Sequence, residues 1–170
     1  MSRNAVAIEE ARRAGAEEAR QADAVMRAAR VLVGVVARSV VEVEDEVSLP
    51  QLRVLVLVAS RGRLNLGQVA ATLGVHPSNA TRTVDRLVVA GLLERTSDPA
   101  DRRYLVLDLT DRGHQIVERV MGYRRESILA VMASMPSSRR RALASALESF
   151  AEAAGERHDG EEAFVLGLPT

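Results

Sequence analysis

One predicted helix of this chain carries side chains suited to contacting nucleic acid along one face. Ser78, Arg82 and Arg86 recur every four residues, so they stack along one side of a helix about 6 Å apart per turn. Asn79 and Thr81 share the polar side of the same segment. Hydroxyl, amide and guanidinium groups can hydrogen-bond to base edges in a major groove about 12 Å wide. The residue types and their spacing therefore indicate a DNA contact surface.

The opposite side of this helix is apolar and predicts how the helix is held. Ala80, Val84, Leu87 and Val88 fall on one face, which we expect to pack on a core. Pro77 falls at the first helical position, where its missing N–H removes no hydrogen bond, and it stiffens the leading end. The small side chains near that end would let the helix backbone come close to DNA.

A shorter helix and a turn precede it. Asn65 can cap the shorter helix, and Gln68 can return a hydrogen bond in a variant of the capping box. Gly74 can end this helix in the left-handed conformation. Gly91 stops the longer helix, and Leu92 then begins a strand. The spacing predicts a helix-turn-helix.

A charged hairpin follows, in the run SDPADRRYLVLDLT. Arg102 and Arg103 are adjacent at its tip and are flanked by acids, including Asp101. An arginine at such a tip can enter a narrow minor groove, where the negative potential is strongest. The acids would limit indiscriminate phosphate binding. Helix, turn, helix and hairpin together predict a winged helix-turn-helix.

Each of these features also has a simpler interpretation. Arginines every four residues usually mark a solvated helix face, and a hairpin with this sequence is usually only a turn. A winged helix can also serve as a protein-interaction module without specific DNA binding, which is the alternative function. An enzyme would need a nucleophile–base pair, paired carboxylates or a cofactor loop. No such constellation occurs in the sequence, so we expect neither catalytic residues nor a cofactor.

The stretch from Leu49 to Gly113 resembles the MarR family of bacterial transcription regulators. The motifs that carry the resemblance are VDRL, GLLER, DPADRR and LDLTDRG. His76 departs from the family pattern, which usually has a serine or threonine as the helix cap, and imidazole is a poorer cap. The resemblance implies a DNA-binding repressor that is commonly released by a small, often aromatic, molecule. The aliphatic side chains around the expected pocket favour an apolar effector.

We expect this protein to bind double-stranded DNA as a homodimer, on an inverted repeat that matches its two-fold symmetry. The residues expected to contact DNA are Pro77, Ser78, Asn79, Thr81, Arg82, Arg86, Asp101, Arg102 and Arg103. Of these, Ser78, Asn79, Thr81 and Arg82 would read bases. Arg86 would hold a phosphate, and the paired arginines of the hairpin would make the wing contact.

The composition bounds the remaining possibilities. The chain has 170 residues and no net charge, and 47% of its residues are hydrophobic but only 2% aromatic, which favours helices packed through aliphatic seams. The stretch between Gln51 and Tyr104 contains eight arginines and four acidic residues, which gives it a local net charge of +4. There is no cysteine, and the three histidines lie far apart, so no metal site is expected. The most apolar run, residues 31–37, is too short to span a membrane, and no cleavable signal precedes it, so we expect a cytoplasmic protein.

The predicted fold is mainly α with a small β wing, a winged helix-turn-helix with long N- and C-terminal dimerisation helices. We expect an N-terminal dimerisation helix in residues 1–48 and the DNA-binding domain in residues 49–110. C-terminal dimerisation helices would occupy residues 111–155, with a tail in residues 156–170. An apolar stripe repeats every three or four residues from Val25 to Val43, more than one chain of this size can cover.

The predicted caps mark where the C-terminal helices begin. Thr110 is expected to cap the first of them. Met135-Pro136 would end that helix, and Ser137 or Ser138 would cap the last one.

Overall fold

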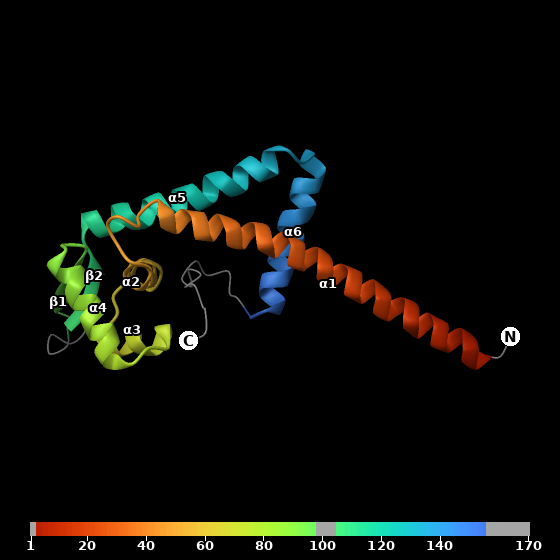
Figure 1. Ribbon diagram of the computed structural model, residues 1–170, viewed down its shortest axis with the longest axis horizontal. Coiled ribbons are helices and arrows are strands. Elements are labelled where there is room, and N and C mark those ends of the chain that lie inside the picture. Colours follow the sequence, from red (N-terminus) through yellow and green to blue (C-terminus); the bar gives the residue numbers. More distant parts are fainter. Residues whose placement is uncertain (1–2, 98–104, 156–170) are drawn as a thin grey trace. The chain divides into compact units, whose positions relative to one another are not determined.

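The computed structural model describes residues 3–97 and 105–155 (Figure 1). Its elements in chain order are α1 (Arg3–Val41), α2 (Leu49–Arg61), α3 (Leu66–Leu73), α4 (Pro77–Val89), β1 (Leu93–Ser97), β2 (Leu105–Leu109), α5 (Asp111–Ala133) and α6 (Ser137–Ala153). This is the mainly helical fold with a two-stranded wing that the sequence predicts. Within these ranges, no helix is both long enough and apolar enough to cross a membrane.

The chain divides into two compact units, residues 1–38 and residues 39–170. The first unit contains most of α1. Glu9 accepts hydrogen bonds from Arg12 at 3.0 Å and from Arg13 at 3.1 Å, within one turn of the helix. These two bonds lower the pKa of Glu9 from its ordinary value, because they stabilise its charged form. Further along, α1 exposes large apolar side chains, including Leu32 and Val33.

The core of the second unit is built around α2, which contacts α3, α4, α5 and β2. Its buried side chains are each at most 5% exposed: Leu52, Val54, Leu55, Val56, Leu57 and Val58. A helix buried on several sides must lie in the middle of its unit. Figure 1 shows α2, α3, α4 and the sheet gathered near the N-terminal end of α5.

Two helices pack on α2 through their own apolar faces. From α4 come Ala80, Val84 and Leu87, each at most 2% exposed. From α5 come Ile116 and Val120, each at most 1% exposed. The Thr110 side chain caps α5 as predicted, because its hydroxyl accepts a hydrogen bond from the Gly113 N–H at 3.1 Å.

The two strands pair antiparallel, with Leu93 opposite Leu109 and Ser97 opposite Leu105. β2 is also joined to the α2–α3 connection, because the Leu107 N–H donates to the Leu64 carbonyl at 2.8 Å. β1 begins at Leu93, one residue later than predicted. Leu92 still belongs to the closure of α4, since its N–H donates to the Leu87 carbonyl at 2.9 Å.

The predicted serine cap of α6 is wrong. Pro136 occupies the N-cap position, the helix begins at Ser137, and no side chain caps it. The extended backbone of Pro136 already has the geometry of an N-cap residue, and its carbonyl accepts the Arg140 N–H at 3.0 Å. α6 has no buried side chain in the single chain, and its Leu147 and Phe150 are exposed.

The start of α5 has no room for a side chain at Gly113. A Cβ added there would lie 2.1 Å from the Leu92 carbonyl oxygen. We expect Gly113→Ala to lower the free energy of unfolding by roughly 1–3 kcal/mol or more, because the backbone itself must shift. Urea denaturation followed by circular dichroism measures this. Gly122→Ala is the matched control on the same helix, since its Cβ would meet nothing within 4 Å. Equal stability of the two variants would contradict the close approach at Leu92.

Candidate nucleic-acid interface

The α3–turn–α4 unit is closed by the local signals that the sequence carries. Asn65 Oδ1 accepts the Gln68 N–H at 2.9 Å, and Gln68 Oε1 accepts the Asn65 N–H at 2.9 Å, which confirms the capping box. Gly74 adopts φ 63° and ψ 30°, the predicted left-handed conformation. The Val75 N–H then donates to the Ala70 carbonyl at 3.1 Å. These bonds fix the angle at which the chain enters α4.

The C-terminal end of α4 is closed in the same way. Gly91 has φ 69°, and its N–H donates to the Val88 carbonyl at 3.0 Å. Together with the bond from Leu92 to Leu87, this is the Schellman arrangement. The length of α4 is therefore fixed at both ends.

The outer face of α4 carries the predicted polar residues. Ser78, Asn79, Thr81 and Arg82 are exposed around its first turns, and Arg86 is exposed one turn further on. Pro77 is the first residue of the helix, as predicted. The structure thus brings the six predicted residues of α4 onto one accessible surface. The wing residues Asp101, Arg102 and Arg103 lie outside the described residues.

Several of these side chains already have local partners. The His76 Nδ1 lies 2.9 Å from Ser78 Oγ and accepts the Ser78 N–H at 3.3 Å, so this histidine does act as the cap. The Thr81 hydroxyl donates to the Pro77 carbonyl at 2.9 Å. Since that hydroxyl proton is used within the helix, Thr81 offers a methyl group and an acceptor to a ligand.

Sequence reasoning missed Arg53, which lies next to this surface. A cleft of about 350 Å³ runs between α2 and α4, and its lining includes Arg53, Arg82 and Arg86, while none of the described residues that line it is acidic. Arg53 Nη2 donates to the Leu73 carbonyl at 3.5 Å, and Arg53 Nε is buried without a hydrogen-bond partner. An arginine inside the apolar run from Leu52 to Val58 was the signal that could have identified it. Its charge strengthens the positive potential beside α4.

Two ion pairs hold the wing strands to the rest of the unit. Asp85 of α4 pairs with Arg95 of β1. Arg63, which precedes α3, pairs with Asp108 of β2 at 2.9 Å. Asp85 therefore ties α4 to the wing.

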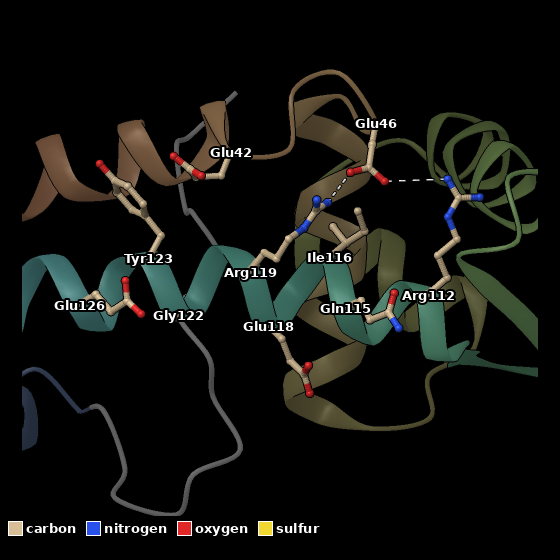
Figure 2. Close-up of a pocket in the computed structure, with 10 residues that line it drawn as sticks. All are labelled: Glu42, Glu46, Arg112, Gln115, Ile116, Glu118, Arg119, Gly122, Tyr123 and Glu126. Atoms are coloured by element: carbon tan, nitrogen blue, oxygen red, sulfur yellow. Dashed lines mark hydrogen bonds and ion pairs between the residues drawn. The ribbon is translucent and has the colours of Figure 1, made fainter.

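A second cleft, of about 710 Å³, lies along α5 beside the connection between α1 and α2 (Figure 2). Glu46 pairs there with Arg119 and, at 3.8 Å, with Arg112. Arg112 also donates to the Ala90 carbonyl at the end of α4, at 3.2 Å. The lining is largely charged, unlike the aliphatic pocket that the sequence favours.

The capped helix-turn-helix, its exposed polar α4 and the paired wing strands define a protein of the winged helix-turn-helix class. A model of the MarR family matches residues 47–105. The crystal structure of RV1404 from Mycobacterium tuberculosis is similar, with 41% identity and a TM-score of 0.70, covering 79% of this chain and 92% of that chain. The chain belongs to the MarR family of transcriptional regulators.

Two curated relatives come from Bacillus subtilis. The uncharacterised HTH-type transcriptional regulator YfiV is 35% identical over 71 residues, which cover 42% of this chain and 44% of YfiV. The HTH-type transcriptional repressor MdtR is 37% identical over 75 residues, which cover 44% of this chain and 48% of MdtR. The chain therefore matches somewhat less than half the length of each of these relatives.

The capping box of α3 can be tested by itself. We expect Asn65→Ala to lower the free energy of unfolding by about 1 kcal/mol, because the Gln68 N–H loses its acceptor. Asn65→Asp keeps an acceptor oxygen and should stay close to the wild type. Urea denaturation compares the three proteins. If the alanine and aspartate variants are equally stable, the side-chain cap contributes nothing.

Proposed function

We propose that this protein is a sequence-specific DNA-binding repressor that acts as a homodimer in the cytoplasm. The observation that carries the proposal is the exposed polar face of α4, held on a helix-turn-helix whose ends are both closed. Ser78, Asn79, Thr81 and Arg82 would read bases, and Arg86 would hold a phosphate. Pro77 would stiffen the leading end of the helix. A repressing role is supported by the likeness to MdtR, which is named a repressor.

The homodimer would form through residues 1–48 and 111–155, leaving residues 49–110 as the DNA-binding domain. Support comes from apolar side chains that the single chain leaves exposed on α5 and α6. Leu129 is 56% exposed, Leu147 48% and Phe150 58%. Large exposed apolar surfaces mark interfaces, and an obligate dimer of this kind should bury more than about 2,000 Å² in total.

The operator would be an inverted repeat, because a two-fold dimer presents two copies of α4. Its half-sites should lie one helical turn apart, about 10 bp centre to centre, so that both helices enter the major groove on one side. The wings, through Asp101, Arg102 and Arg103, would reach minor grooves outside the half-sites. A·T-rich flanks would favour this contact because they narrow the groove.

Release from DNA by a small apolar or aromatic molecule is the last part of the proposal and follows from the family resemblance. The charged cleft of Figure 2 does not suit an apolar ligand. The exposed apolar faces of α5 and α6 suit one better, provided that a second copy encloses them.

The two arginines of α4 should behave differently in DNA binding. Arg82→Ala should weaken binding to the specific site by about 1–3 kcal/mol and relax base preference. Arg86→Ala should weaken binding to all DNA sequences alike and reduce the salt dependence of binding by about one phosphate contact. Gel shifts at several salt concentrations, with DNA upstream of the protein's own gene and with random DNA, compare the two variants.

Arg139→Ala is the control for these arginine variants, because it removes an exposed arginine from α6, far along the chain from α4. It should bind both DNAs like the wild type. Identical behaviour of Arg82→Ala and Arg86→Ala on the two DNAs would refute the division of roles. If the wild type binds the two DNAs with equal affinity, the result favours the alternative function, a protein-interaction module without specific DNA binding.

The dimer can be tested through α6. We expect the wild type to sediment at twice the mass of one chain, and the double variant Leu147→Glu/Phe150→Glu to shift toward the monomer, because burying a carboxylate in an apolar interface is costly. Ser149→Glu places one negative charge on a neighbouring exposed position of α6 and should leave the dimer intact. A wild type that stays monomeric at every concentration would rule out the dimer.

A further inference from the structure

Two of the proposed base-reading residues are hydrogen-bonded to each other. Arg82 Nη2 donates to Asn79 Oδ1 at 2.7 Å, and both side chains are exposed on α4. Positions three apart on a helix are neighbours, so the contact requires no unusual geometry. A guanidinium group has donors and no acceptor. The carboxamide atom that faces Arg82 must therefore be the oxygen, and the amide nitrogen of Asn79 points elsewhere.

The surroundings of Arg82 favour this partner. Asp85 lies one turn beyond Arg82 and is the carboxylate that would otherwise attract it. Asp85 is engaged by Arg95 of the wing strand instead. Arg82 thus turns back toward the first turn of α4, whose residues contact base edges when such a helix enters the major groove.

This bond changes what Asn79 can read. A free asparagine recognises adenine by presenting its oxygen and its nitrogen side by side to the base edge, where it accepts from N6 and donates to N7. An amide oxygen has two lone pairs, but the contact with Arg82 fixes the direction of the Asn79 carboxamide, so its oxygen and nitrogen are not free to align side by side with one base edge. Asn79 presents its amide N–H groups, which need an acceptor.

We infer that Asn79 and Arg82 act as one specificity-determining pair, in which Arg82 reads a guanine and Asn79 donates to an acceptor on the neighbouring base. That neighbour would be a guanine, through O6 or N7, or a thymine, through O4. This inference rests on the proposed function and adds the kind of base that the pair selects. Asn79 also acts on Arg82 as a positioning residue, because it holds the guanidinium toward the leading end of the helix.

The test selects binding sites for the full-length protein from a random DNA library and sequences them, for the wild type, Asn79→Asp and Asn79→Ala. The aspartate keeps an acceptor for Arg82 but replaces the outward donor by an acceptor. We expect the preferred neighbouring base to change to cytosine or adenine, which present donors, by about tenfold or more in relative affinity. Asn79→Ala should lose the preference at that position and weaken the guanine preference at the adjoining one.

A uniform loss of affinity from the added negative charge cancels in these ratios. Gln115→Glu makes the same change of charge at an exposed position of α5 and should leave the selected sequence unaltered. Both Asn79 variants alter an exposed side chain, and their thermal unfolding can be compared with that of the wild type.

Three outcomes would overturn the inference. A wild type that selects a site whose base preferences are unchanged in Asn79→Asp would reject the pair and leave the proposed function standing. An adenine preference that depends on Asn79 would show that Asn79 reads adenine through both its oxygen and its nitrogen, and would reject the pair. A wild type that selects no sequence would reject both the proposed function and the pair.

Discussion

The position of α4 depends on the burial of α2. The six buried side chains of α2 face more than one neighbour, so this helix cannot rotate without exposing part of the core. Val84 and Leu87 of α4 are fully buried on the same cluster. Each such side chain contributes about 1.5–3 kcal/mol when it is removed from water. A rotation of α4 that turned its polar face inward would lose these contributions and bury its arginines, so apolar packing decides which residues face outward.

The apolar core determines the position of α4, and two ion pairs then orient the wing beside it. The pairs Asp85–Arg95 and Arg63–Asp108 connect the wing to α4 and to the start of α3. Both pairs are partly exposed, and surface pairs typically contribute less than about 1 kcal/mol. These pairs therefore affect the orientation of the wing more than the stability of the fold. By occupying Asp85, the pair with Arg95 removes the carboxylate that would compete for Arg82.

Local signals could be predicted from the sequence, and contacts between distant residues could not. The caps at Asn65 and Thr110 and the turn at Gly74 depend on residues within a few positions, so the sequence alone is sufficient for them. The Asn79–Arg82 bond is also local, but two side chains at this spacing have several rotamers, and only the structure selects one.

The contact between Arg124 and Ser39 is an example of a contact between distant residues, which the sequence alone does not predict. Arg124 is 9% exposed and donates to Ser39 Oγ at 2.8 Å, although the two residues are 85 positions apart. Burial lowers the pKa of this arginine from its ordinary value, because desolvation disfavours the charged form. Arg124 follows Val120 by four residues and so lies in phase with the buried stripe of α5, but this spacing does not reveal which distant residue it contacts. The predicted serine cap of α6 was wrong because Pro136 and two serines follow one another, and each of them could occupy the N-cap position.

The two ends of α4 differ in the charged groups that lie beside them. At the C-terminal end, Arg112 donates to the Ala90 carbonyl, so a cation meets the negative end of the helix dipole. Arg112 is held there by Glu46, which is also bound by Arg119 of α5. At the N-terminal end the described residues place no acid in the first turn.

The first turn of α4 itself thus supplies no carboxylate to the positive end of the dipole. That end lies beside Ser78 and Asn79, which are exposed. A helix N-terminus of this kind favours a phosphate or an electronegative base edge. Arg112 thus engages the Ala90 carbonyl at the C-terminal end of α4, whereas the N-terminal end, beside Ser78 and Asn79, stays accessible to a ligand.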